Sequence, residues 1–131
     1  MTKDEAIKYW TTSADNDFRA ALHLHEKGDH AWSLFIGHLV IEKLLKARYV
    51  MKTGGIPPFI HDLARLAELS ALELTEEQKD TLDTISSFNI QGRYDDYKMS
   101  FQRKCTDVFS KKWIGEILEF SEWIKKQLPK Q

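Results

Sequence analysis

The chain has 131 residues, of which 42% are hydrophobic and 30% charged, and its 19 basic and 20 acidic residues leave a net charge of −1. This length and composition fit one globular domain over residues 1–131 with a substantial core. The near-neutral charge argues against a dedicated high-affinity nucleic-acid binder. No apolar run approaches the roughly 20 residues that cross a bilayer, so no membrane association is expected. The single cysteine, Cys105, fits a reducing compartment, and the N-terminus lacks the apolar core of a signal peptide, so a cytoplasmic location is expected.

Charge is distributed unevenly along the chain. Residues 62–83 hold seven acidic against two basic residues, whereas residues 93–112 hold six basic against three acidic ones. A locally basic segment either faces phosphate groups or is simply solvated.

Apolar residues at helical spacing predict a first helix over about residues 3–27 and a second over about residues 30–52. Gly28 and Asp29 form the turn between them, with Asp29 as the N-cap of the second helix. The second helix is apolar around most of its circumference. Such a helix is expected either at the centre of a bundle or in contact with a second subunit.

A glycine and proline segment, residues 54–58, ends the second helix. A short helix is expected next, over about residues 61–70. Another follows over about residues 76–88, where Thr75 and Gln78 have the spacing of a capping box.

Residues 89–104 are polar and aromatic without a clear period and are expected to form an irregular loop. A last amphipathic helix is expected over about residues 106–128. No alternating strand pattern, repeat or interdomain linker is present. The sequence therefore predicts an all-α fold, an up-and-down bundle of four main helices plus a short helix.

Three short polar clusters interrupt this helical sequence. They are Glu42-Lys43-Leu44-Leu45-Lys46, His61-Asp62-Leu63 and Gly92-Arg93-Tyr94-Asp95-Asp96. Burying a charge costs free energy unless the charge is paired, so each cluster belongs either to a structural ion-pair network or to a ligand site.

In the first cluster, His38, Glu42 and Lys46 follow one another at intervals of four residues and share a stripe of the second helix. One interpretation is a Glu42–Lys46 ion pair in a buried network with His38. The other is that Lys43 and Lys46 project into a cleft that binds phosphate.

In the second cluster, His61 is expected as the N-cap of the short helix, with Asp62 in its first turn, where the helix dipole favours a negative charge. One histidine and one aspartate do not make a metal site. His23 and His25 face different directions on a helix, so no metal or other cofactor is expected.

The third cluster combines guanidinium, phenol and carboxylate groups within a few residues. Arg93 is suited to clamp a phosphate, and Tyr94 or Tyr97 to stack on a base, with Asp95 as a supporting carboxylate. The alternative is that Arg93 pairs with an acidic residue, Asp62 or Glu42, and pins the loop to the bundle.

Together these observations predict one cleft formed by the three clusters. Its phosphate-binding residues are expected to be Lys43, Lys46, Arg93 and Tyr94, supported by Glu42, His61, Asp62 and Asp95. No catalytic residue is assigned.

The order of these motifs resembles a known family. Trp10-x3-Ala14-Asp15-x-Asp17-x3-Ala21 is followed by Ile41-Glu42-Lys43-Leu44-Leu45-Lys46-Ala47, Pro57-Pro58-x2-His61-Asp62-Leu63 and Gly92-Arg93-Tyr94-Asp95. Over nearly the whole chain this is similar to a HEPN domain of the small prokaryotic kind, often encoded beside a minimal nucleotidyltransferase. The resemblance implies a homodimer, a nucleotidyltransferase partner and a toxin-antitoxin-like pair.

Ribonuclease members of this family share an Arg-x(4–6)-His motif near the last helices. In this chain no histidine follows Arg93 or Arg103, and the one match in spacing, Arg19 and His25, lies on the first helix. The resemblance therefore implies a non-nuclease domain that binds nucleotide or phosphate. Two alternatives stay open: a metal-independent ribonuclease toxin that uses Arg93 with an acid such as Asp95 or Asp96, and a dimeric helical adaptor without a ligand.

Overall fold

The computed structural model describes residues 1–129, apart from the side chains of residues 95 and 96. Over these residues the chain is helical and contains no strand, which confirms the all-α expectation. The helices are α1 (Lys3–Glu26), α2 (His30–Thr53), α3 (Leu63–Leu69), α4 (Glu76–Arg93), α5 (Asp95–Lys104) and α6 (Asp107–Lys125).

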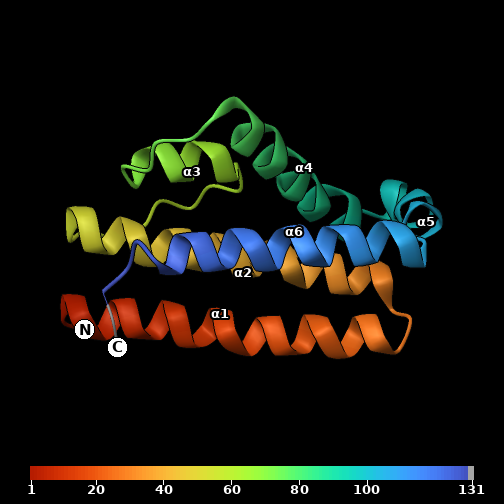
Figure 1. Cartoon of the computed structure of the whole chain (residues 1–131), viewed down its shortest axis with the longest axis horizontal. Helices are drawn as coiled ribbons and strands as arrows, with labels where there is room; N and C mark the ends of the chain where they lie inside the picture. Colours follow the sequence, from red (N-terminus) through yellow and green to blue (C-terminus); the bar gives the residue numbers. More distant parts are fainter. Residues whose placement is uncertain (130–131) are drawn as a thin grey trace.

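Helix α2 is the centre of the fold. It pairs with α1 in an antiparallel hairpin, α6 lies along it, and α3 and α4 pack on the other side (Figure 1). Each of the other five helices contacts α2, and Leu34, Ile41, Leu44 and Leu45 are fully buried. The central position expected from its apolar circumference is therefore confirmed.

Short-range signals fix most helix boundaries. Thr75 and Gln78 form the predicted capping box, and Gly54 ends α2 in the left-handed conformation with φ of 69°. Asp29 is the N-cap residue of α2, as predicted, although its side chain makes no capping hydrogen bond. Thr106 caps α6 by accepting a hydrogen bond from the N–H of Phe109.

The expectation of an irregular loop over residues 89–104 is wrong. Helix α4 continues to Arg93, and a separate helix, α5, spans Asp95–Lys104. Phe101 is buried and packs against Phe88 of α4, with ring centroids 5.6 Å apart. One buried aromatic residue therefore anchors a helix whose sequence is otherwise largely polar. With α5, the described chain holds one helix more than the expected bundle.

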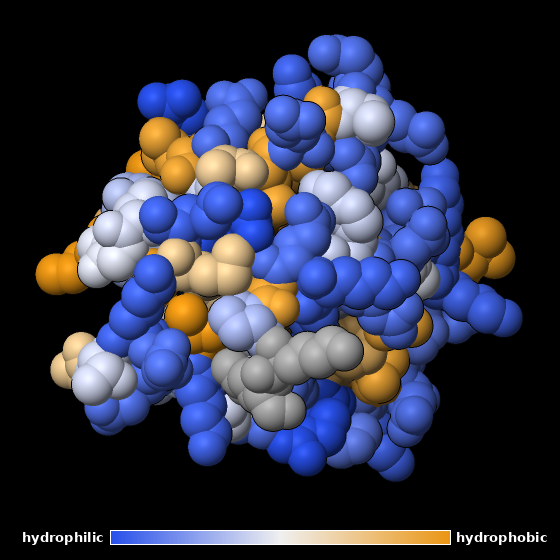
Figure 2. Space-filling view, turned by 60° about the vertical axis from the view of Figure 1, so that its left-hand side comes forward, coloured by the Kyte–Doolittle hydropathy of each residue, from blue (hydrophilic) through white to orange (hydrophobic). Residues whose placement is uncertain are grey.

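None of the described helices combines the length and the apolar character needed to cross a membrane. On the face shown in Figure 2, apolar side chains form small separate patches among hydrophilic ones. This face therefore presents no broad apolar area of the kind that forms a contact between subunits.

Candidate functional site

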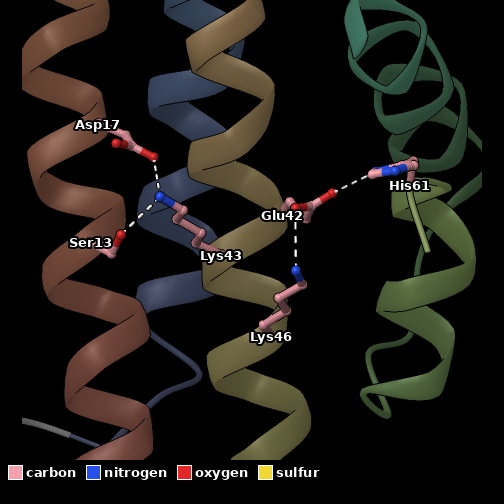
Figure 3. A network of polar contacts seen from close by, with 6 residues as sticks. All are labelled: Ser13, Asp17, Glu42, Lys43, Lys46 and His61. Carbon is pink, nitrogen blue, oxygen red and sulfur yellow. Dashed lines mark hydrogen bonds and ion pairs between the residues drawn. The ribbon is translucent and has the colours of Figure 1, made fainter. Parts of the chain in front are cut away.

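Lys43 points from α2 toward α1. Its Nζ donates hydrogen bonds to Ser13 Oγ at 2.8 Å and to Asp17 Oδ2 at 2.6 Å (Figure 3). The side chains of Lys43 and Asp17 are both mostly buried. The positive charge of Lys43 is therefore paired within the α1–α2 hairpin.

Glu42 points to the other side of α2 and is only 6% exposed. Its carboxylate accepts hydrogen bonds from Lys46 Nζ at 3.4 Å and from His61 Nδ1 at 3.3 Å. We call Glu42, Lys46 and His61 the Glu42 cluster. A buried carboxylate is stable only when its charge is paired, and these two partners supply that pairing. The predicted Glu42–Lys46 ion pair is thereby confirmed.

Lys46 is held by aromatic rings as well as by Glu42. Its Nζ lies 5.0 Å from the ring centroid of Trp10 and 5.9 Å from that of Phe59. A cation over an aromatic face is attracted by the ring quadrupole. Trp10 and Phe59 were missed as site residues, because an aromatic residue at helical spacing or after prolines carries no sequence signal beyond ordinary packing.

His38 is buried on α2, one turn before Glu42. Its Nδ1 lies 2.5 Å from the carbonyl oxygen of Phe35, so this nitrogen carries the proton, while Nε2 is buried without a partner in the described part of the chain. The pKa of His38 is lowered to about 4, mainly by burial. Arg93 and His61 add to this lowering, whereas the Phe35 carbonyl and Glu42 partly offset it. His38 is therefore neutral at pH 7.

The second cluster differs from its expected arrangement. Asp62, not His61, is the N-cap of α3, and its carboxylate accepts a hydrogen bond from the N–H of Arg65 at 3.1 Å. The prediction that His61 caps this helix is therefore wrong, because the His61 side chain turns toward Glu42 instead. Asp62 has a structural role as a cap.

Arg93 ends α4 and is exposed, with its Cζ 5.7 Å from the ring centroid of Phe35. Phe35 in turn packs edge-to-face against Trp32, with centroids 5.8 Å apart, and Tyr94 is 55% exposed. We call Trp32, Phe35, Arg93 and Tyr94 the Arg93 face. Neither Asp62 nor Glu42 pairs with Arg93, and none of the carboxylates among the described side chains does so. The side chain of Asp95, expected to support this site, lies outside the described residues.

The three predicted cations do not share one cleft. Lys43 faces α1, Lys46 belongs to the Glu42 cluster, and Arg93 lies on its own face. Successive residues of an α-helix are turned by about 100°, so Glu42 and Lys43 point to different neighbours. Only Lys46, one turn after Glu42, shares its direction. The convergence prediction is therefore wrong for Lys43.

Arg93 and the Glu42 cluster nevertheless act electrostatically on the same residue, His38. Both the charge of Arg93 and that of His61 act on the buried His38 imidazole, as does the carboxylate of Glu42. The exposed Arg93 guanidinium and the internally paired Glu42 carboxylate therefore both influence the protonation of His38.

Comparisons with known proteins agree with this architecture. The family model described as HEPN domain matches residues 7–127. The structure is similar to the crystal structure of TT1696 from Thermus thermophilus, with a TM-score of 0.78 and 19% sequence identity over 93% of this chain and 98% of that one. No curated protein sequence matches the chain. Because the family model covers nearly the whole sequence, the chain belongs to the HEPN domain family.

Proposed function

We propose that this chain is a non-nuclease HEPN domain that binds a nucleotide or another phosphate-bearing group at the Arg93 face. It works as a homodimer beside a minimal nucleotidyltransferase, in a toxin-antitoxin-like pair. The homodimer and the nucleotidyltransferase partner rest on the family resemblance of the sequence. The ligand class rests on the geometry around Arg93.

The observation that carries the ligand proposal is the exposed guanidinium of Arg93, which pairs with none of the carboxylates that the structure describes. Among the cations assigned to the site, Lys43 already pairs with Asp17 and Lys46 with Glu42, whereas Arg93 pairs with no described carboxylate. The Phe35 ring holds the guanidinium from one side. A planar guanidinium fixed in this way keeps its N–H groups available for bidentate contact with a phosphate.

Exposed aromatic side chains of α2 and of the α4–α5 segment supply surfaces on which a base can stack. Trp32 is 49% exposed, and Tyr94 and Tyr97 are both more than half exposed. Stacking on such rings together with a cation on the phosphate is the usual way to bind single nucleotides or single strands with little sequence preference. A nucleotide therefore fits this face better than a bare anion does.

The test compares binding of ATP and of a short single-stranded RNA by the full chain and by Arg93→Ala. We expect the replacement to weaken both by about 1–3 kcal/mol, the range for a lost charge-assisted hydrogen bond. Arg93→Lys keeps the charge but loses the bidentate geometry, so intermediate affinity is expected. Calorimetric titration measures the affinities, and circular dichroism confirms that each variant is folded.

Arg65→Ala is the matched control. Arg65 is also an exposed arginine, on α3, where it pairs with Glu68 at 3.7 Å. Its loss should leave affinity unchanged. Equal weakening in both arginine variants would show a general charge effect, and an Arg93→Ala chain that unfolds while Arg93→Lys binds normally would make Arg93 a structural clamp.

A second candidate is a helical adaptor without a ligand. It is favoured by the internal pairing of the two lysines, since Lys43 and Lys46 are both satisfied by acidic residues of the same chain. Absence of nucleotide and RNA binding by the folded wild-type chain would select this candidate.

A further inference from the structure

Three potential metal ligands from distant parts of the sequence meet at one end of the molecule. His25 lies in the last turn of α1, His30 is the first residue of α2, and Asp107 is the first residue of α6. The α1–α2 turn and the beginning of α6 lie at the same end, opposite the N-terminus (Figure 1). One ligand atom from each of the three residues lies within 4.8 Å of the others.

The distances suit a small cation after a slight closing movement. Nε2 of His30 lies 3.6 Å from Asp107 Oδ1, and the imidazole rings of His25 and His30 are 4.8 Å apart between centroids. Zinc binds histidine nitrogen and carboxylate oxygen at about 2.0–2.2 Å, so two tetrahedral ligands stand roughly 3.3 Å apart. Asp107 has a side chain that is 79% exposed, so it can move toward the two histidines.

An ion pair between His30 and Asp107 accounts for only part of this arrangement. The Nδ1 atoms of both His25 and His30 are buried without a hydrogen-bond partner in the part of the chain that the structure describes. Buried polar atoms are nearly always satisfied, so two such nitrogens in adjacent rings require an explanation. A bound metal ion with His25 Nδ1 as a ligand would explain the first of these. His30 faces Asp107 through Nε2 and offers one ion a single nitrogen, so its Nδ1 stays outside the coordination.

The local electrostatics are mixed. The carboxyl end of α1 favours a cation, whereas the amino ends of α2 and α6 oppose one. The carboxylate of Asp107 offsets that opposition, because it is the only negatively charged ligand of the three. Two nitrogen donors and one oxygen donor select zinc and similar transition metals over magnesium or calcium, which prefer oxygen ligands alone.

We propose that His25, His30 and Asp107 bind one divalent transition-metal ion of the zinc class. The ion joins the ends of α1, α2 and α6 and leaves at least one coordination position for water or an external ligand. The histidine pair escapes notice in the sequence because the two residues flank a turn and the third ligand lies far along the chain. The proposal stands independently of phosphate binding at the Arg93 face.

The experiment titrates Zn²⁺ into the full chain after removal of metals with a chelator. We expect one equivalent to bind and to raise the thermal transition, as any ligand of the folded state does, while Mg²⁺ does neither. His25→Ala, His30→Ala and Asp107→Asn should each weaken Zn²⁺ binding at least tenfold. Substitution with Co²⁺ should give visible absorption bands that change in each variant.

His23→Ala is the matched control, because His23 is exposed on the same helix turn and is not one of the three ligands. This variant should bind Zn²⁺ as the wild type does. Asp107→Asn is nearly isosteric at an exposed position, so it keeps the test valid if either histidine variant fails to fold. Absence of Zn²⁺ binding at tens of micromolar, unchanged affinity in Asp107→Asn, or equal loss in His23→Ala would overturn the proposal.

Discussion

Burial makes protonation of the His38 imidazole unfavourable in the folded chain. Its pKa falls to about 4 from a usual value of 6.5, mainly through burial, with Arg93 and His61 also lowering it and Glu42 and the Phe35 carbonyl raising it. Below pH 6.5 the unfolded chain takes up a proton at this residue, and the folded chain does not do so until about pH 4. Acid therefore favours unfolding across this window.

We expect His38 to lower the free energy of unfolding by about 3 kcal/mol as the pH falls from 6.5 to 4. In His38→Asn this contribution disappears, while the amide nitrogen replaces Nδ1 as the donor to the Phe35 carbonyl. Urea denaturation at several pH values measures the slope in both chains. Identical slopes would contradict the neutral, buried state of His38.

At the scale of helices, the sequence correctly predicted the helix ends that depend on residues close together in the chain. The capping box at Thr75 and the end of α2 at Gly54 are local and appear as expected. Gly92 was instead placed within the expected loop over residues 89–104, whereas it lies inside α4. A Cβ at this position would lie 2.9 Å from Phe35 Cδ2, so glycine allows α4 to approach α2. That reason is tertiary, and no local pattern reveals it.

We expect Gly92→Ala to lower the free energy of unfolding by about 1–3 kcal/mol, because the new methyl group forces Phe35 to move within a packed contact. Gly115→Ala is the matched control, since a Cβ there meets no atom within 4 Å. It should raise stability by up to about 1 kcal/mol through helix propensity. Urea denaturation of both variants gives the comparison, and stabilisation by Gly92→Ala would contradict the packing argument.

At the scale of the whole molecule, the sequence indicated the fold class and the family but not how the polar clusters meet. Lys43 and Lys46 were expected to act together, yet they point to different helices, because the direction of a side chain depends on which neighbour packs there. The apolar circumference of α2 is explained by its contacts with five helices of the same chain. A homodimer therefore stays a prediction that rests on family resemblance.

The folded chain should leave RNA intact, with or without divalent metal. Metal-free cleavage needs an imidazole that exchanges a proton near neutrality and reaches the substrate. His38 is buried, and its pKa is lowered to about 4 by burial and, in part, by the charge of Arg93. Nδ1 of His61 is hydrogen-bonded to the Glu42 carboxylate at 3.3 Å. Incubation with end-labelled RNA and gel analysis should show no more product than buffer alone. Cleavage that disappears in Arg93→Ala would instead establish a ribonuclease, and cleavage that disappears only in His25→Ala would assign it to the Arg19–His25 pair on α1.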